Sequence, residues 1–203
     1  MRKLILQMQM SVDGFVGNLP GGHTPWQVWG WGDQWPWDPD LKSEFNGTVA
    51  AADTILLSRP MITEGYLDHW AAVAERNRDN PEFDFARRIV SANKVVATGQ
   101  EMAASWDKTV VATGPLAATI GELKRAPGKN IICFGGSGFG AALLSAKLVD
   151  ELQLYVNPTA LGRGTAIFEN GWRFDLLSAR QFDCGIVVQK FRPKEPMNGD
   201  LRS

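Results

Sequence analysis

The chain has 203 residues, of which 44% are hydrophobic, and this is enough apolar material for one domain with a substantial core. The net charge of −1 argues against nucleic-acid and membrane-surface binding, because both need an excess or a cluster of basic residues. The two cysteines lie in apolar, strand-like contexts and neither histidine is near them, which argues against a disulfide framework and a zinc site. We therefore expect a cytoplasmic protein without a metal.

The N-terminal segment does not have the pattern of a targeting signal. Its apolar run is interrupted by Gln7 and Gln9 and is followed by Asp13, so it lacks the continuous apolar region of a signal peptide. No stretch approaches the roughly 18 apolar residues of a membrane span. We expect neither a signal peptide nor a membrane-spanning segment.

The first predicted element is a strand over residues 3–10. Apolar and polar side chains alternate there, so Gln7 and Gln9 are expected on the face opposite the apolar residues. A long irregular segment rich in Gly, Pro and Trp follows, over residues 11–38.

A helix is predicted to begin at Pro39, with Asp38 as its N-cap. Leu41, Phe45 and Val49 recur every four residues and mark its buried face. The patterns that follow predict, in chain order, strand 53–58, helices 65–78 and 81–91, strands 93–98 and 108–113, helix 115–125, strand 129–134 and helix 139–147.

The C-terminal part is rich in strand patterns. A strand is predicted over 150–158, and residues 172–182 and 184–193 are predicted to form an extended pair. Strands that alternate with helices and end in a β-rich segment indicate an α/β fold with a mostly parallel sheet and an antiparallel edge. We expect a single domain over residues 1–192 and a loose tail over 193–203.

Residues 134–140, FGGSGFG, lie between an apolar strand and a helix. Glycines let a phosphate approach the backbone closely, and the N-terminus of a helix offers free N–H groups and a positive dipole end. This favours a phosphate site. A tight turn that binds no ligand is the alternative.

The same stretch partly matches the dinucleotide-binding fingerprint through Gly136, Gly138 and Ala141. An ordinary Rossmann dehydrogenase should also carry an acidic residue about 20 positions later, and its motif usually lies in the first strand-to-helix turn. The next strand offers only Asp150 and Glu151, which come too early, and several strands precede the motif. The sequence therefore argues against that class of enzyme.

Three segments together resemble the dihydrofolate-reductase-like family. They are MSVDGFVG after the first strand, LLSRPM after the second, and GGSGFGAALLSAKLVDELQLYVNPTALGRGTAIF. The resemblance spans nearly the whole chain and is greatest to the branch related to the C-terminal reductase domain of the bacterial bifunctional deaminase-reductase of riboflavin biosynthesis.

This resemblance implies a mostly parallel sheet with helices on both faces, NADPH across the strand ends, and hydride transfer to a pterin, folate or ribosylaminopyrimidine ring. It places Met10 and Ser11 beside the nicotinamide, and Arg59, preceded by Ser58, on the 2′-phosphate. The other cofactor residues it implies are Thr98, Gly99, Gly135, Gly136, Ser137, Gly138, Phe139 and Gly140.

The residues at the positions where the family binds its substrate match the family pattern less closely. Ser58 replaces the usual glycine, Phe134 replaces a substrate-binding glutamate, and the Asp-x-Pro motif of the riboflavin enzymes is missing after the second strand. We assign Phe134 to the substrate site by position, and the sequence does not identify the substrate.

Five of the eight tryptophans lie between Trp26 and Trp37. Aromatic faces suit a planar heteroaromatic substrate, so this segment is a candidate lid, with Trp26 in the substrate site. The alternative is that the indoles cover the core or a subunit interface. Asp13 is the candidate catalytic residue, either ordering the loop over the nicotinamide or relaying a proton, and the alternative is a plain turn aspartate.

The sequence thus predicts an NADPH-dependent reductase of a small heteroaromatic substrate. A non-catalytic dinucleotide- or pterin-binding protein of the same fold is the alternative. We also expect a homodimer, because the apolar strands at the C-terminus leave a sheet edge to cover and relatives of this family usually dimerise.

Overall fold

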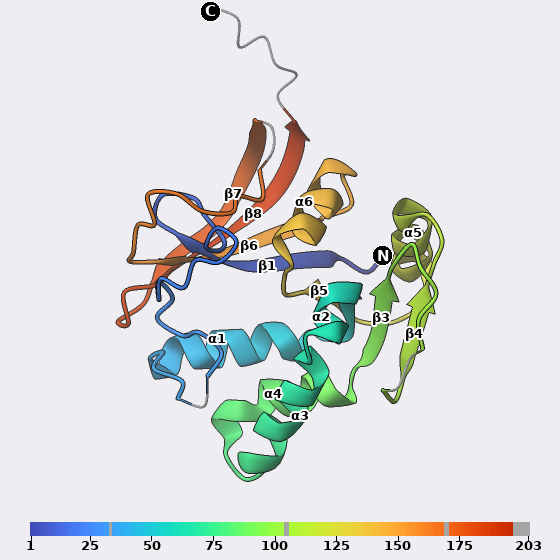
Figure 1. The fold of residues 1–203 in the computed structure, drawn as a ribbon, viewed down its shortest axis with the longest axis horizontal. Coiled ribbons are helices and arrows are strands. Elements are labelled where there is room, and N and C mark those ends of the chain that lie inside the picture. Colours follow the sequence, from blue (N-terminus) through green and yellow to red (C-terminus); the bar gives the residue numbers. More distant parts are fainter. Residues whose placement is uncertain (33, 104–105, 169–170, 197–203) are drawn as a thin grey trace, which may run out of the picture. The chain divides into compact units, whose positions relative to one another are not determined.

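The computed structural model describes residues 1–203 with the exception of 33, 104–105, 169–170 and 197–203 (Figure 1). The chain divides into two compact units, each assembled from separate segments. Unit 1 comprises Met1–Leu4 and Pro39–Gly136, and unit 2 comprises Ile5–Asp38 and Ser137–Ser203. No helix within the described ranges has the length and apolar character needed to cross a membrane.

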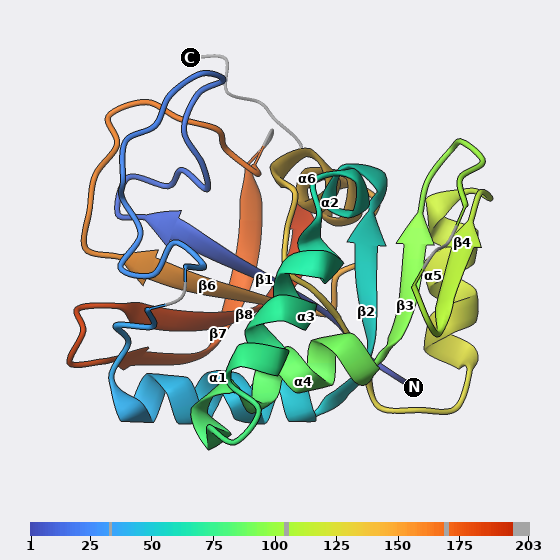
Figure 2. The same ribbon diagram turned by 60° about the horizontal axis from the view of Figure 1, so that its bottom comes forward.

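Unit 1 contains four parallel strands in the order β4-β3-β2-β5. Figure 2 shows β2, β3 and β4 side by side and pointing the same way. The strands are β2 (Ala52–Ser58), β3 (Asn93–Ala97), β4 (Thr109–Ala112) and β5 (Asn130–Cys133). The helices are α1 (Pro39–Ala50), α2 (Arg59–Thr63), α3 (Tyr66–Arg76), α4 (Asp84–Ser91) and α5 (Leu116–Arg125), with a short 3₁₀ turn η1 (Pro81–Phe83).

The core of unit 1 follows the predicted periodicity. Leu41, Phe45 and Val49 of α1 are buried, as their four-residue spacing predicts. Phe45 meets Phe85 of α4 edge to face at 5.1 Å between ring centroids, and Phe85 meets Trp70 of α3 at 5.1 Å. These aromatic contacts join three helices of the unit.

Unit 2 contains four strands in the order β1-β6-β8-β7. The pair β1–β6 is parallel, and the pairs β6–β8 and β8–β7 are antiparallel. Figure 1 shows β7 and β8 as a long pair of arrows. The elements are β1 (Leu4–Ser11), α6 (Ser137–Ser145), β6 (Glu151–Asn157), β7 (Trp172–Gln181) and β8 (Val187–Pro196). The predicted fold class, mostly parallel with an antiparallel C-terminal edge, is confirmed.

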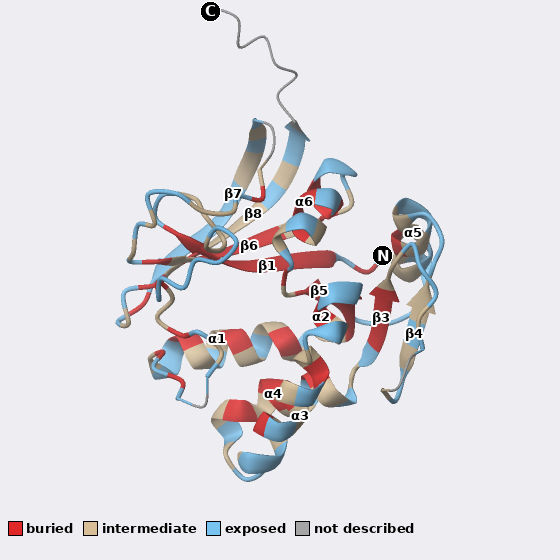
Figure 3. Cartoon of the chain, in the orientation of Figure 1, coloured by how far each residue is buried: buried red, intermediate tan, exposed pale blue. Residues whose placement is uncertain are grey.

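Strand β1 is buried along its whole length, on both faces (Figure 3). The alternation of polar and apolar residues predicted that Gln7 and Gln9 lie on the face opposite the apolar residues. That face is also buried, so their amides lie in the interior. Gln7 Nε2 donates hydrogen bonds to Gln153 Oε1 at 3.0 Å and to the Tyr155 hydroxyl at 2.9 Å. Burial is possible because these polar groups bond to one another.

Several predicted boundaries shift, and two of the shifts concern the glycine stretch and the C-terminal tail. The helix predicted over 139–147 begins at Ser137 and ends at Ser145. Its first turns contain Gly138 and Gly140, which are poor helix formers and obscured the start. Strand β8 continues to Pro196, so the first residues of the predicted tail are strand, while residues 197–203 lie outside the described part of the chain.

Candidate functional site

The predicted site residues fall in both units, and unit 1 ends within the glycine stretch, at Gly136. In unit 1 the strand order reverses beside β2. The chain passes from β2 to β3 to β4 on one side, and β5 then pairs on the other side of β2. Open parallel sheets bind ligands at the carboxyl ends of the strands where the order reverses. Ser58 ends β2 there, and Phe134 follows β5.

The predicted adenosine-side residues come together at the ends of β2 and β3. Ser58 pairs with Ala97 in register, so Arg59 at the start of α2 lies beside the loop after β3. The exposed Arg59 guanidinium donates a hydrogen bond to the side-chain oxygen of Gln100. The Gln100 N–H in turn bonds the Thr98 hydroxyl at 3.2 Å. An exposed guanidinium held at a strand end is suited to bind a phosphate.

The glycine turn has the backbone geometry that glycine permits. Gly135 has a φ of 131° and Gly136 a φ of 78°, both in the region that side chains disfavour. Helix α6 begins immediately afterwards at Ser137, so the free N–H groups of its first turn follow the turn directly. This arrangement fits a phosphate group, which these N–H groups and the helix dipole would hold.

The later glycines of the stretch differ in their surroundings. Gly140 is buried in α6, and a Cβ there would lie 3.5 Å from a methyl of Leu6, so its small size lets the helix pack on β1. Gly138 faces open space. Packing of α6 on β1 is therefore an alternative explanation for the glycine at position 140, besides the predicted cofactor role.

At the end of β1 in unit 2, Asp13 joins two loops. Its carboxylate accepts hydrogen bonds from the Ser11 hydroxyl at 2.6 Å, from the Leu161 N–H at 3.0 Å and from the Gly162 N–H at 2.6 Å. The hydrogen bond from the Ser11 hydroxyl is the main reason that the pKa of Asp13 lies below its ordinary value of 3.8. Hydrogen bonds from the backbone N–H groups lower this pKa further. These hydrogen bonds fit a role of Asp13 in ordering the loop.

The residues predicted beside the nicotinamide lie at the same strand end. Met10 is 6% exposed and Ser11 is 1% exposed, and they pair in register with Val156 and Asn157 of β6. The Ser11 hydroxyl also accepts a hydrogen bond from the Phe15 N–H at 3.0 Å.

The tryptophan-rich segment forms a core cluster. Trp29 is 1% exposed, and its ring lies 4.7 Å from Trp31, 4.8 Å from Trp35 and 5.1 Å from Trp37 between centroids. Trp37 stacks on Tyr155 at 5.4 Å. These contacts favour the alternative that the indoles cover the core, and the lid interpretation stays a prediction.

Polar contacts hold the same segment to the strand ends. Gln9 Nε2 donates a hydrogen bond to the Trp29 carbonyl at 2.9 Å, and the Val28 N–H donates to Asn157 Oδ1 at 2.8 Å. Trp26, predicted in the substrate site, is 6% exposed. A substrate would reach its ring only after the segment moves.

The sequence analysis missed Tyr66 and His69 of α3. The Tyr66 hydroxyl and His69 Nε2 are buried, and neither has a hydrogen-bond partner among the described residues. Phe134, predicted in the substrate site, is half-buried and its ring lies 6.0 Å from that of Phe45. The one available signal was rarity, because the chain has only two tyrosines and two histidines.

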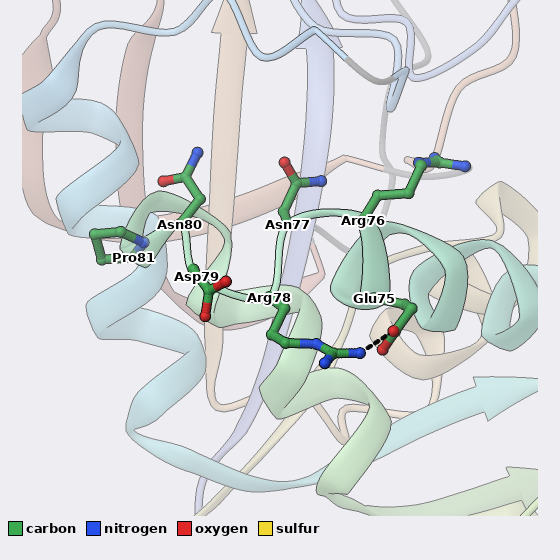
Figure 4. Close-up of a pocket in the computed structure, with 7 residues that line it drawn as sticks. All are labelled: Glu75, Arg76, Asn77, Arg78, Asp79, Asn80 and Pro81. Atoms are coloured by element: carbon green, nitrogen blue, oxygen red, sulfur yellow. Dashed lines mark hydrogen bonds and ion pairs between the residues drawn. The ribbon is translucent and has the colours of Figure 1, made fainter.

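Two surface hollows of unit 1 are lined by residues that were not predicted to form a site. One of about 650 Å³ lies over the loop after α3, where Arg78 pairs with Glu75 (Figure 4). Arg87 builds this loop by donating hydrogen bonds to the carbonyls of Asn77 and Asn80. The second, of about 640 Å³, is lined by residues including Arg2 and Lys124. Neither contains a predicted site residue, and the described side chains hold no cluster of three or more potential metal ligands.

Comparisons with known proteins agree with this architecture. YyaP of Bacillus subtilis strain 168, an uncharacterized protein, is 24% identical over 189 residues, which cover 92% of each chain. A pyrimidine reductase-like protein from Corynebacterium diphtheriae NCTC superposes with a TM-score of 0.60 at 15% identity, covering 96% of this chain and 92% of that one.

A further structure is the diaminohydroxyphosphoribosylaminopyrimidine deaminase/5-amino-6-(5-phosphoribosylamino)uracil reductase of Thermotoga maritima. It superposes with a TM-score of 0.62 at 14% identity over 95% of this chain, which spans 57% of that longer protein. The family model of the RibD C-terminal domain matches residues 2–188. The resemblance predicted from the sequence is thereby confirmed, and the chain belongs to the RibD C-terminal domain family.

Proposed function

We propose that this protein is an NADPH-dependent reductase that transfers a hydride to a small heteroaromatic substrate of the pyrimidine type. The observation that carries the proposal is the match to the RibD C-terminal domain over residues 2–188. The relative from Thermotoga maritima is named a uracil reductase and the one from Corynebacterium diphtheriae a pyrimidine reductase-like protein, and both share the fold.

The residues present fit a nicotinamide dinucleotide. Gly135 and Gly136 have the positive φ angles of a turn that lets a phosphate approach, and the first turn of α6 follows. Arg59 offers an exposed guanidinium beside Thr98 and Gln100 for an adenosine phosphate. NADPH, when bound, supplies the hydride. The protein binds and orients the cofactor and excludes water from it.

Asp13 is proposed as a positioning residue. Its three hydrogen bonds fix the Ser11 hydroxyl and the backbone at Leu161 and Gly162, so it holds the loop after β1 against the loop after β6. By the resemblance, Met10 and Ser11 in this region lie next to the nicotinamide. A rigid loop there would keep the ring in place.

A non-catalytic dinucleotide- or pterin-binding protein is the second candidate function. It is favoured by the environment of Asp13, because an ionised and fully engaged carboxylate does not supply the proton that a reduction needs. A turnover assay separates this candidate from the reductase.

We further propose a homodimer that acts in the cytoplasm on a small molecule. Leu176 and Leu177 of β7 are 59% and 42% exposed, and β7 pairs with β8 and with no other described strand. An exposed edge strand with apolar side chains is suited to association with a second copy.

The cofactor assignment is tested by Arg59→Ala. We expect the affinity for NADPH to fall about 10- to 100-fold, the cost of losing a charge-assisted hydrogen bond to a phosphate. Affinity for NADH, which lacks the 2′-phosphate, should stay unchanged. Isothermal titration calorimetry with both cofactors measures this, and Arg125→Ala, at an exposed arginine of α5, is the matched control. Equal losses of affinity for NADPH and NADH would contradict the assignment of Arg59 to the 2′-phosphate.

A further inference from the structure

The second surface hollow of unit 1 lies at the amino ends of its strands. Its volume of about 640 Å³ is in the range of small-molecule sites. Ala51, just before β2, and Asn130, at the start of β5, both line it. Ser58 and Gly135 lie at the opposite ends of these two strands. The hollow is therefore separate from the strand ends assigned to the cofactor, and Figure 2 shows β2 and β3 pointing away from the N-terminus.

Every charged side chain that lines this hollow is basic. The described lining holds no aspartate or glutamate, and its charged residues are Arg2, Lys124, Arg125 and Lys129. The whole chain is balanced, with 21 basic and 22 acidic residues, so this clustering does not follow from the composition. Folding brings it about, because Arg2 is 127 positions away from Lys129.

Part of the positive charge has a structural role. The buried Arg2 guanidinium pairs with the Asp53 carboxylate. It also donates hydrogen bonds to the carbonyls of Lys129 at 2.5 Å and Leu123 at 3.4 Å. Lys129 Nζ donates to the carbonyl of Ala50, the last residue of α1, at 3.1 Å. Since Leu123 and Ala50 lie in the last turns of α5 and α1, these cations stabilise the negative ends of two helix dipoles.

This structural role does not use all of the positive charge. Four basic side chains are opposed by the Asp53 carboxylate and by two helix ends of about half a negative charge each, which leaves about +2. Hydrogen-bond donors also remain, because an ammonium has three N–H groups and the Ala50 carbonyl takes one of those of Lys129. Arg125 and Lys129 are exposed, so a dissolved anion can reach both.

A phosphate monoester matches this charge. It carries about −1.5 to −2 at neutral pH and has three acceptor oxygens. Guanidinium and ammonium groups both bind phosphate in proteins, and a guanidinium holds two of its oxygens at once. The volume of the hollow also leaves room for the molecule that carries the phosphate.

We propose that this hollow is a second ligand site of unit 1, which binds the phosphate monoester of a small molecule. Arg125 and Lys129 contact the phosphate, and Lys124 adds its charge to the same site. Arg2 and Asp53 are positioning residues, because the guanidinium bonds the Lys129 carbonyl and the carboxylate accepts the Lys129 N–H at 2.7 Å. The ligand stabilises the folded unit and does not enter the cofactor site.

Ribose 5-phosphate is the probe, with ribose as its uncharged counterpart, and isothermal titration calorimetry measures the affinity. We expect ribose 5-phosphate to bind and ribose not to bind. At about 100 times its Kd, ribose 5-phosphate should raise the Tm by about 5–10 °C. Its affinity should stay the same in the presence of NADPH, because the two sites are separate. No binding of ribose 5-phosphate, equal binding of ribose, or competition by NADPH would each overturn the proposal.

Arg125→Glu locates the site, with Arg76→Glu as the matched control. Both arginines are exposed, and each is the last residue of its helix, α5 or α3. Arg125→Glu should weaken the binding of ribose 5-phosphate about 10- to 100-fold and Lys129→Gln about tenfold, since each loses a charge-assisted hydrogen bond. Arg76→Glu should leave the affinity unchanged. Unchanged affinity in Arg125→Glu, or an equal loss in Arg76→Glu, would contradict a site at this hollow.

Inorganic phosphate distinguishes the free ion from a phosphorylated molecule. We expect it to bind more weakly than ribose 5-phosphate, because it does not contact the rest of the hollow. Equal affinities would make the free ion the ligand and would overturn the assignment to a phosphorylated molecule. None of these outcomes depends on the oxidation of NADPH, so the failure of this proposal and the failure of the proposed reductase function are distinguishable.

Discussion

Two buried polar clusters, one in each unit, differ in how fully they are hydrogen-bonded. In unit 2, the amides of Gln7 and Gln153 and the Tyr155 hydroxyl bond to one another between β1 and β6. In unit 1, the Tyr66 hydroxyl and His69 Nε2 are buried without such bonds. Polar groups that bond to one another help to specify a structure, whereas a buried polar atom without a partner calls for an explanation.

The difference matters because both regions hold a tyrosine ring against a tryptophan in the folded chain. Trp37 stacks on Tyr155, and Trp70 lies edge to face with Tyr66. The two regions differ in the hydrogen-bond partners of the tyrosine hydroxyl. Such partners come from residues distant in the sequence. Gln7 is 148 positions away from Tyr155.

The largest expected effect tests the structural role of the polar interior of unit 2. Asn157 is fully buried, accepts the Val28 N–H at 2.8 Å and donates to the Tyr155 carbonyl at 3.0 Å. Asn157→Leu leaves these groups unpaired, so we expect a loss of about 3 kcal/mol in the free energy of unfolding, or about 6–12 °C in Tm. Thermal denaturation measures it.

The control for this variant is Asn18→Leu, at a half-buried asparagine that bonds the Thr24 carbonyl at 3.1 Å, and it should lose much less stability. Equal losses for the two variants would mean that the interior network of unit 2 is no more important than a surface contact.

The next effect concerns the glycine turn. Gly136→Ala and Gly21→Ala place a side chain at nearly equal φ angles, 78° and 79°, so each should lose about 1 kcal/mol of stability from backbone strain. We expect only Gly136→Ala to lose NADPH binding, because only this residue precedes the N-terminus of α6. Calorimetric titration of both variants decides whether the turn binds phosphate, and unchanged binding by Gly136→Ala would leave it as a plain turn.

The smallest effect is the pH dependence contributed by Asp13. Its folded pKa is lowered, so its stabilising contribution is present above the ordinary value of 3.8 and is lost as the pH falls through the folded pKa. The Tm of Asp13→Ala should therefore lie below that of the unaltered protein at neutral pH, and the gap should close in strong acid. A gap that is constant with pH would contradict a role for the Asp13 charge in joining the loops.

The sequence predicted those features that depend on local pattern. The spacing of Leu41, Phe45 and Val49 identified the buried face of α1, and the glycine stretch marked the turn after β5. The buried face and the turn follow from helix and strand periodicity and from backbone conformation. Arg59 and the loop after β3 were implied by the family resemblance, and the structure brings Arg59 into contact with Gln100.

Features that depend on tertiary partners were missed. The composition of the tryptophan segment was compatible with a lid or with a core, and it is the tertiary contacts of Trp29 and Trp37 that favour the core. Tyr66 and His69 had no distinguishing spacing, because the absence of a hydrogen-bond partner is a property of the folded chain. Local pattern does not encode this property.

The most direct test of the central proposal is oxidation of NADPH in the presence of candidate substrates. The assay compares a ribosylaminopyrimidine, a dihydropterin and dihydrofolate, with the loss of nicotinamide absorbance matched to the amount of reduced product. The account predicts stoichiometric oxidation with the pyrimidine and none when the substrate is omitted. Tight binding of NADPH without oxidation by any of the three would contradict it and favour a non-catalytic binding protein.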